Sequence, residues 1–421
     1  MQEDKLLRLF LGWSSPHLAL QMWDGRLVSN PPQAKVKIIF NSPEVLRRFV
    51  RPTLGSLATA YVEGEIDIEG TSEDILTVAE EVVGGTFLPR RSFFARLWRF
   101  FPSWLSHSPK ADARAIHSHY DISNEFYSLF LDSQMVYSCA YFRDPTMNLD
   151  EAQEAKLDHT CKKLLLRPEE RFLDIGCGWG ALVVHAAKHY GVRAAGVTLS
   201  QNQYDHARQW IEKEGLEKRA RVFLQDYRKL DEKEPFDKIA SVGMFEHVGW
   251  AHLGEYFSKV QRLLVPGGVF LNHGITSGAV GGGGLGSGAG RFMDKYVFPR
   301  GELVHVAEVI RKAAGAGLEP WDLECLRPHY EKTLRQWVQR LEAKEKEAIA
   351  ITGEKAYRIW RIYMAGAAHG FSRGWMSVCQ LVALKPEASG RLPLPWTRDY
   401  IYAEERQAKP AALPLSLSEA G

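Results

Sequence analysis

Four separate stretches of the chain carry side chains that could together hold a small polar ligand. Glu246 and His247 lie in SVGMFEHVG, which is otherwise apolar, and a carboxylate in such surroundings must be paired or functional. The other groups are a thiol, an imidazole and a phenol: Cys139 in MVYSCAYF, His273 in LNHGIT and Tyr330 in LRPHYEKTL. They could converge in an apolar pocket, although the spacing alone does not show that they do.

A metal centre is the alternative interpretation, because histidine, cysteine and glutamate are metal ligands. The candidates come from distant stretches, and the close pair His117 and His119 would alternate badly on a helix. A nucleophilic cysteine–histidine pair has no supporting local context either. We therefore expect neither a metal nor a cysteine nucleophile.

A glycine-rich turn follows the short apolar run RFLDI and leads into the helical segment ALVVHAAKHY. Gly176, Gly178 and Gly180 lie at alternating positions, where a missing Cβ lets the backbone approach a ligand closely. A dinucleotide fingerprint would instead read GxGxxG, with an acid about 20 residues further on. Asp174 before the first glycine is typical of class I S-adenosylmethionine (SAM) methyltransferases, in which this loop wraps the cofactor. The alternative is a tight turn that only lets a helix pack on a sheet.

Strands alternate with helices from residue 117 onward, which predicts an α/β fold with a doubly wound, mostly parallel sheet. Such sheets place ligands at the carboxyl ends of their strands. We therefore expect five polar residues at one edge of the sheet: Asp174, Thr198, Asp226, Glu246 and His273.

Three residues near this edge could bind a nucleoside-like cofactor. Asp226 could accept a hydrogen bond from an adenine amino group, and Thr198 and Gln203 could bind ribose hydroxyls or a carboxylate. Taken singly, each is as well explained as a helix cap or a solvated side chain.

The composition is ordinary for a globular protein, with 421 residues of which 45% are apolar and 25% charged. This length predicts two domains or one decorated domain. A formal net charge of +2 at pH 7 is too small to indicate nucleic acid. The five cysteines include no CxxC pair, which favours reduced thiols in the cytoplasm. We expect no signal peptide and no transmembrane span.

The chain divides into three parts. Residues 1–83 predict a small α+β domain for lipid docking or dimerisation, with a hairpin at Asp24-Gly25, a strand at KVKIIF and helices at SPEVLRRFV and TSEDILTVAEEVV. Residues 84–114 form a basic, aromatic linker that could lie in a membrane interface or dock on its own protein. Residues 115–421 predict the catalytic domain with a C-terminal tail. Its glycine-rich run at 276–290 is either a mobile loop over the site or a surface insertion.

Six stretches resemble, in order, the cyclopropane-fatty-acyl-phospholipid synthases and the related mycolic-acid methyltransferases. They are HSHYDISNEFYSLFLD, MVYSCAYF, LDIGCGWGALVVHAA, GVTLSQNQ, SVGMFEHVG and DKYVFPRGEL. The segment before them is similar to the N-terminal domain of the phospholipid-acting members, which mycolic-type enzymes lack. The resemblance implies a class I SAM-methyltransferase fold and favours a phospholipid substrate.

The resemblance also implies the reaction. The methyl carbon of SAM is transferred to the cis double bond of an unsaturated acyl chain in a membrane phospholipid, and a carbocation forms. Bound bicarbonate removes a proton and the cyclopropane ring closes. The residues that resemble the bicarbonate cage are Cys139, Glu246, His273 and Tyr330, with the backbone of Ile275. Those that resemble the SAM site are Tyr137, Ser138, Asp174, Gly176, Gly178, Gly180, Thr198, Gln203, Asp226 and Tyr227.

The family implies a cytoplasmic homodimer bound peripherally to the inner face of the membrane. Two alternatives stay open. A hydride shift in the cation would make the enzyme a C-methyltransferase that yields methyl- or methylene-branched chains, and loss of catalysis would leave a lipid-binding protein.

Overall fold

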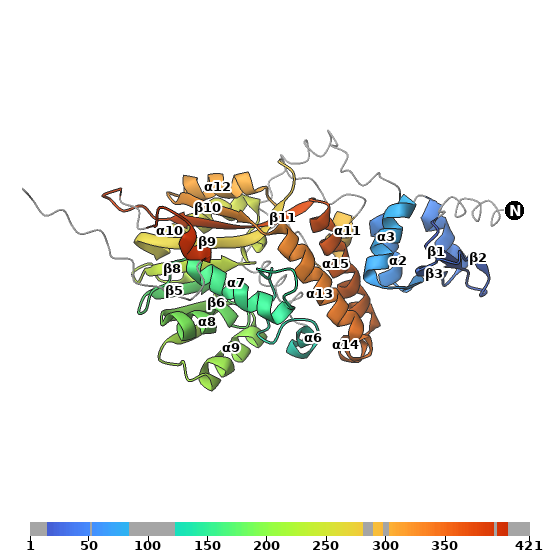
Figure 1. Cartoon of the computed structure of the whole chain (residues 1–421), viewed down its shortest axis with the longest axis horizontal. Coiled ribbons are helices and arrows are strands. Elements are labelled where there is room, and N and C mark those ends of the chain that lie inside the picture. Colours follow the sequence, from blue (N-terminus) through green and yellow to red (C-terminus); the bar gives the residue numbers. More distant parts are fainter. Residues whose placement is uncertain are drawn as a thin grey trace, which may run out of the picture.

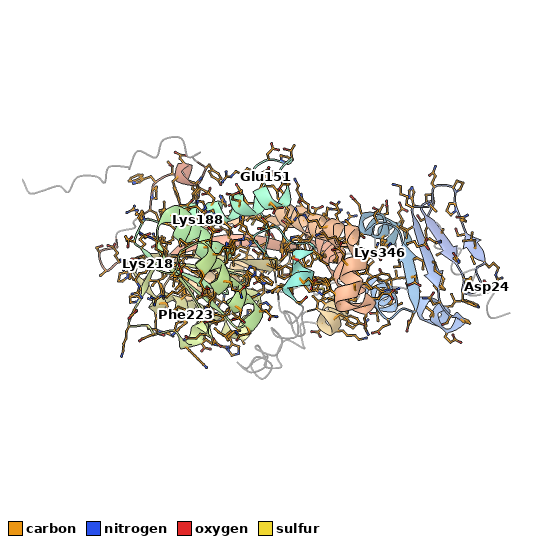
Figure 2. The ribbon with its side chains drawn as sticks, turned by 90° about the horizontal axis from the view of Figure 1, so that it is seen from below. Asp24, Glu151, Lys188, Lys218, Phe223 and Lys346 are labelled. Carbon is orange, nitrogen blue, oxygen red and sulfur yellow. The ribbon has the colours of Figure 1, made fainter. Side chains whose placement is uncertain are left out.

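A computed structural model describes residues 15–50, 53–83, 123–280, 289–297, 303–390 and 394–402 of the chain. These residues form a large sheet with helices on both faces, a group of helices beside it and a small N-terminal unit at the far end (Figure 1). Asp24 in the N-terminal hairpin and Phe223 on the last strand of the large sheet lie toward opposite ends of the molecule (Figure 2). The helical group therefore joins the two sheets.

Seven strands form the large sheet in the order β10-β11-β9-β8-β5-β6-β7. Five of them are parallel: β5 (Arg171–Ile175), β6 (Arg193–Thr198), β7 (Ala220–Leu224), β8 (Phe236–Val242) and β9 (Leu264–Ser277). At one end of the sheet, β11 (Met376–Leu384) pairs antiparallel with β9, and the edge strand β10 (Glu319–Cys325) pairs antiparallel with β11. The doubly wound, mostly parallel sheet predicted from the sequence is confirmed.

Helices cover both faces of this sheet, which is why its central strands are buried along most of their length. One face packs against α7 (Leu149–Lys163), α8 (Ala181–Tyr190) and α9 (Gln201–Lys213). The other packs against α10 (Leu253–Leu263) and α12 (Val306–Gly315). The carboxyl ends of the parallel strands stay accessible between these layers.

A third group of helices packs beside the carboxyl ends of the strands. Its members are α6 (Asn124–Ser128), α11 (Ala289–Tyr296), α13 (Arg327–Ala343), α14 (Glu345–Thr352) and α15 (Glu354–Ser372). Large aromatic side chains fill its interior, among them Phe126, Tyr127, Trp337 and Trp360. The sequence reasoning did not predict these helices.

The N-terminal unit has a four-stranded sheet in the order β2-β1-β3-β4. Its strands are β1 (Leu18–Gln21), β2 (Leu27–Ser29), β3 (Val36–Phe40) and β4 (Ile66–Glu69), and its helices are α2 (Leu54–Val62) and α3 (Ser72–Val83). The predicted hairpin is confirmed, with Gly25 at a φ of 85° in its turn. The predicted helix at SPEVLRRFV is a 3₁₀ helix, η1 (Pro43–Val50).

Two arginines of α15 hold the N-terminal unit against the helical group. Arg361 is 7% exposed, and its guanidinium donates to Glu342 at 2.7 Å, to the Tyr61 hydroxyl at 3.0 Å and to the Gly70 carbonyl. Arg358 donates to Asp67 and to the Tyr61 carbonyl. The orientation of the unit is thus fixed by directional bonds as well as by apolar packing.

Two sequence predictions fall outside the described residues. They are the basic linker at 84–114 and most of the glycine-rich run, from 281 to 288. None of the helices in the described ranges is long and apolar enough to cross a membrane. The division into domains at 83 and 114 remains a prediction.

We expect Arg361→Met to lower the free energy of unfolding by about 3 kcal/mol, because it leaves polar partners unpaired in a buried interface. Arg335→Met is the matched control, since Arg335 also pairs with the N-terminal unit, at Glu73, but its side chain is 33% exposed. That change should cost less than about 1 kcal/mol. Urea unfolding followed by tryptophan fluorescence measures both, and equal losses would contradict the role given to Arg361.

Candidate active site

The glycine-rich turn between β5 and α8 has the backbone geometry that only glycine adopts readily. Gly176, Gly178 and Gly180 have φ values of 79°, 54° and 93°. A Cβ on Gly176 would lie 2.8 Å from the Met244 side chain, and one on Gly180 would lie 2.8 Å from Ala207. A Cβ on Gly178 would meet nothing within 4 Å, because this residue faces a cavity.

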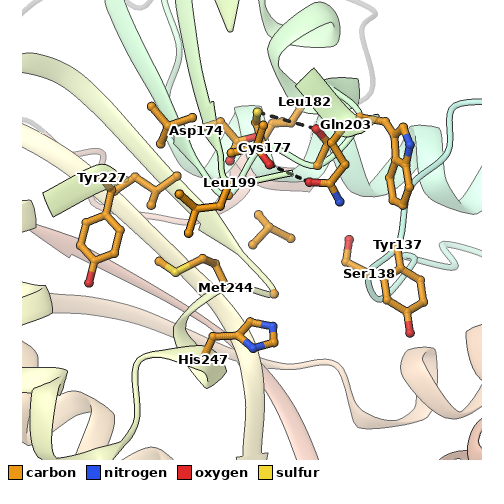
Figure 3. Close-up of a pocket in the computed structure, with 18 of the residues that line it drawn as sticks. Tyr137, Ser138, Asp174, Cys177, Leu182, Leu199, Gln203, Tyr227, Met244 and His247 are labelled. Carbon is orange, nitrogen blue, oxygen red and sulfur yellow. Dashed lines mark hydrogen bonds between the residues drawn. The ribbon is translucent and has the colours of Figure 1, made fainter. Parts of the chain in front are cut away.

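The cavity lies at the carboxyl ends of β5, β6 and β8, where the sequence placed a ligand (Figure 3). Nine of the ten residues predicted to bind SAM line it: Tyr137, Ser138, Asp174, Gly176, Gly178, Thr198, Gln203, Asp226 and Tyr227. Gly180, the tenth, does not line it and is the N-cap residue of α8. The structure thus brings the predicted cofactor residues together, and their binding role remains a prediction.

Two hydrogen bonds orient polar groups at the edge of this cavity. The Thr198 hydroxyl donates to the Gln203 side-chain oxygen at 2.7 Å, which leaves the Gln203 amide nitrogen as a donor (Figure 3). Asp226 accepts from the Arg228 guanidinium at 2.7 Å. Burial acts to raise the pKa of Asp226, but the Arg228 hydrogen bonds outweigh it and keep the pKa below its ordinary value. Asp226 is therefore an ionised acceptor.

Asp174 is a buried acid at the floor of the cavity. It is 3% exposed, and its Oδ1 atom has no hydrogen-bond partner. Burial raises its pKa to about 7, against the opposing charge of Lys156. An unpaired buried carboxylate is costly, so its position fits a ligand that brings a cation or a donor.

Lys156 on α7 also reaches the cavity, and sequence reasoning missed it. Its ammonium donates to the Ser138 hydroxyl at 3.0 Å, and burial lowers its pKa to about 8. A lysine in a helical stretch normally faces water. Nothing in the local pattern shows that this one points inward.

The segment that carries Tyr137 and Ser138 is held rigidly. Asp132 accepts from two backbone N–H groups of the following turn, each at 2.9 Å, and Met135 in that turn has a φ of 57°. The buried Gln153 amide donates to the Ser138 carbonyl at 2.9 Å. These bonds outweigh the backbone strain of Met135 in its left-handed conformation, and they fix the wall of the cavity.

Glu246 lies in η5 (Phe245–His247), directly behind the cavity. Its Oε1 atom accepts from the Ile275 backbone N–H at 2.6 Å, and its buried Oε2 atom has no partner. A Cβ on Gly274 would lie 2.0 Å from the Phe245 ring, so glycine is required for this approach. Burial raises the pKa of Glu246 to about 7, although the Ile275 N–H opposes it.

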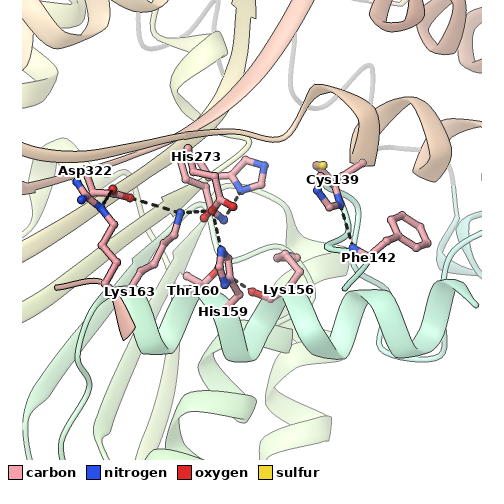
Figure 4. A network of polar contacts seen from close by, with 12 residues as sticks. Cys139, Phe142, Lys156, His159, Thr160, Lys163, His273 and Asp322 are labelled. Atoms are coloured by element: carbon pink, nitrogen blue, oxygen red, sulfur yellow. Dashed lines mark hydrogen bonds and ion pairs between the residues drawn. The ribbon is translucent and has the colours of Figure 1, made fainter. Parts of the chain in front are cut away.

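His273 lies two residues before Ile275 on β9 and is buried and neutral. Burial lowers its pKa to about 3. The amide nitrogen of Gln380 on β11 donates to its Nδ1 atom at 3.1 Å, which leaves the ring proton on Nε2. That Nε2 atom is buried without a partner. Figure 4 shows His273 above α7, whose last residue, Lys163, forms an ion pair with Asp322.

Cys139 and Tyr330 lie in the aromatic interior of the helical group. The Cys139 thiol is 3.2 Å from the Ala140 carbonyl and 3.9 Å from the Leu326 carbonyl, and burial raises its pKa. Tyr330 packs on Phe371, with ring centroids 4.8 Å apart. The Ile275 side chain packs against the same cluster. Ile275 therefore joins the two halves of the predicted cage: its N–H binds Glu246, and its side chain contacts the cluster with Cys139 and Tyr330.

A second cavity lies between α15, α11 and the N-terminal unit. About 1220 Å³ in it is free of protein atoms, including space open to solvent. Its lining is almost entirely apolar and includes Leu57, Leu76, Ala79, Phe292, Ile362 and Tyr363. The Tyr363 side chain lies close to Tyr137, a wall residue of the first cavity, and the Tyr137 side chain opposes the rise that burial causes in the pKa of Tyr363. The two cavities therefore meet at this tyrosine pair.

Gln380 and Tyr363 are further site residues that sequence reasoning missed. Gln380 lies in an apolar strand and is fully buried, and a lone polar residue in such a strand is the signal that could have found it. Tyr363 lies in a helix with several aromatic residues, where no signal separates it from the others.

Known proteins match the part of the chain that carries the candidate active site. The profile of a family described as mycolic acid cyclopropane synthetase matches residues 107–381. A probable fatty acid methyltransferase of Pseudomonas putida is 43% identical over 385 residues, which are 91% of this chain and 96% of that protein. Cyclopropane mycolic acid synthase 1 of Mycobacterium tuberculosis is 37% identical over 278 residues, 64% of this chain and 96% of that protein. The crystal structure of mycolic acid cyclopropane synthase CmaA1 complexed with SAH and CTAB is 37% identical and superposes with a TM-score of 0.61, covering 65% of this chain and 98% of that chain.

We expect the affinity for S-adenosylhomocysteine to rise about tenfold from about pH 6 to about pH 8. The Asp174 carboxyl has a pKa of about 7 and must lose its proton to pair with a cationic amino group. Lys156, whose pKa is about 8, loses a like charge in the same range and acts in the same direction. Asp174→Asn should weaken binding and reduce the pH slope in isothermal titration calorimetry.

Glu255→Gln is the control for this experiment, because Glu255 lines the same cavity but its side chain is 69% exposed. It should keep both the affinity and the pH slope. An Asp174→Asn protein with unchanged affinity would remove Asp174 from the cofactor site.

Proposed function

The chain belongs to the mycolic acid cyclopropane synthetase family and is a SAM-dependent methyltransferase, and from this premise we propose its substrate and product. It transfers the methyl carbon of SAM to the cis double bond of an unsaturated acyl chain in a membrane phospholipid. Loss of a proton then closes a cyclopropane ring.

The observation that carries this proposal is the meeting of the two cavities. The first has the polar and glycine residues suited to a nucleoside-containing cofactor, and the second is suited to hydrocarbon. The interacting side chains of Tyr137 and Tyr363 lie where they meet. An acyl chain in the second cavity would present its double bond beside the cofactor.

The N-terminal unit supports a phospholipid rather than a mycolic acid. Leu57 on α2 and Leu76 and Ala79 on α3 form one wall of the second cavity. The Pseudomonas putida relative matches 91% of this chain, whereas the mycolic acid synthase matches 64% of it and 96% of itself. The cavity wall that the N-terminal unit adds has no counterpart in the mycolic acid synthase, and this difference is consistent with a lipid substrate other than a mycolic acid.

The chemistry requires positioning and the exclusion of water, because an alkene is a poor nucleophile and water would trap a carbocation. SAM supplies an electrophilic methyl group when bound. The rings of Tyr137 and Trp337, stacked with centroids 5.2 Å apart, present π faces that favour positive charge nearby. The aromatic interior around them excludes water.

Bicarbonate would supply the base in this reaction. The residues present fit such a small anion, because Glu246 Oε2 and His273 Nε2 are buried polar atoms without partners. His273 can donate from Nε2, and Glu246, whose pKa is about 7, can share a proton with an anion. Cys139, Tyr330 and the backbone at Ile275 would complete the site.

We also propose a homodimer that binds the inner face of the membrane peripherally. The sequence of residues 84–114, which is basic and rich in aromatic side chains, supports the membrane contact.

The deciding experiment incubates the protein with SAM and vesicles of cis-unsaturated phospholipid and measures acyl masses. We expect a gain of one CH2 that resists hydrogenation, which identifies a ring. A gain of CH2 that hydrogenation alters would instead assign a branched chain that keeps a double bond, and fragmentation would locate the methyl or methylene branch. No gain with any unsaturated lipid would leave only lipid binding.

Glu246→Gln should reduce turnover at least about 100-fold, because the amide cannot share its proton with an anion in the same way. Its affinity for S-adenosylhomocysteine should stay within about twofold, since Glu246 does not line the cofactor cavity. Loss of that affinity instead would place Glu246 in the cofactor site.

Ala79→Phe tests the acyl cavity, because the added ring enters it from α3. We expect turnover of long-chain phospholipid to fall about tenfold or more while affinity for S-adenosylhomocysteine is retained. Thr77→Phe, on an exposed position of the same helix, is the control and should leave turnover unchanged. Equal effects of the two changes, or no effect of Ala79→Phe, would exclude α3 from the substrate path.

A further inference from the structure

Two cysteines that are distant in sequence lie directly opposite each other on neighbouring strands. Cys325 ends β10 and Cys379 lies within β11, and the strand register pairs them. Their sulfur atoms are 3.2 Å apart, and both are free thiols. The sequence spacing of the five cysteines gave no sign of this pair.

The hydrogen bonds of the two strands show that the pair is suited to a disulfide. The next residue pair along the ladder exchanges a hydrogen bond, from the Leu326 N–H to the Val378 carbonyl at 2.8 Å. Cys325 and Cys379 therefore form a non-hydrogen-bonded pair, in which Cα atoms approach to about 4.5 Å. That separation lies within the range that disulfides span.

The pair also differs from the other cysteines in access. Cys325 is exposed, whereas Cys139, Cys161, Cys177 and Cys379 are buried. Burial raises the pKa of Cys379 to about 12, so this partner stays a thiol. An oxidant would therefore react first at Cys325 and leave the three other buried thiols intact.

The strands of this pair lead to both halves of the candidate active site. The carbonyl of Leu326, next to Cys325, lies 3.9 Å from the Cys139 thiol. Leu326 is also the N-cap residue of α13, the helix that carries Tyr330. Gln380, next to Cys379, holds His273. A bond that draws the two strands together would disturb these contacts.

We propose that Cys325 and Cys379 are a redox-responsive dithiol whose oxidation by peroxide closes a disulfide and slows turnover. The Cys325 thiolate attacks hydrogen peroxide, takes up one oxygen as a sulfenic acid and releases water after protonation. The Cys379 sulfur then attacks the sulfenic sulfur, the S–O bond breaks, and a second water leaves with the Cys379 proton. In total, two thiols and one peroxide give one disulfide and two waters. A dithiol reductant then reduces the disulfide and restores the two thiols.

Peptide mapping tests the bond independently of the proposed function. The full chain is treated with a small molar excess of hydrogen peroxide, remaining thiols are alkylated, and the protein is digested without reductant. We expect one cross-linked peptide pair, lighter by two hydrogens, that contains Cys325 and Cys379 and disappears with dithiothreitol. Oxidation of Cys325 to sulfinic acid without a cross-link would overturn the proposal.

Turnover with SAM and unsaturated vesicles tests the consequence, and this part rests on the proposed function. Peroxide should slow the native protein several-fold and reversibly, while Cys325→Ser should start at the native rate and keep it. A cross-link with unchanged turnover, or equal inhibition of Cys325→Ser, would refute the coupling. Absence of turnover before oxidation would refute the proposed function instead, and the peptide map would still decide whether the bond forms.

Discussion

The candidate active site depends on one short contact, the hydrogen bond from the Ile275 N–H to the Glu246 carboxylate at 2.6 Å. The contact is possible because Gly274 has no side chain where the Phe245 ring lies. One residue earlier, Met244 packs closely on Gly176 of the cofactor turn. The short segment 244–246 is therefore fixed between two glycines, and any shift of it would move the cofactor cavity and Glu246 together.

Local signals in the sequence were sufficient for the parallel part of the sheet and for grouping the predicted cofactor residues at one edge of it. The alternation of apolar runs and helical segments gave the order of β5 to β9, and the glycines marked the turn at Asp174. Because parallel strands end at one edge, residues that follow different strands could be grouped from the order of the strands alone. Thr198 and Asp226, near the ends of β6 and β7, were placed correctly for that reason.

The rest of the site could not be predicted, because long-range packing decides it. Lys156 is a polar residue in an ordinary helical pattern, and only the tertiary structure turns it inward. The pairing of Cys325 with Cys379 depends on β11, which returns antiparallel after the three helices α13 to α15. No local period in the sequence specifies such a return.

The two cavities explain why α15 carries both buried charge and apolar residues in consecutive positions. Arg361 binds the N-terminal unit, while Ile362 and Tyr363, the next two residues, line the second cavity. Apolar packing alone would let the unit slide along α15, because hydrophobic contacts are not directional. The bonds of Arg361 to Tyr61, Gly70 and Glu342 permit one orientation, so the wall made by α2 and α3 stays in register with Tyr363. A buried ion pair is a costly way to gain stability, but it suits the second cavity, because its walls on α15 and on the N-terminal unit must keep a fixed relative position.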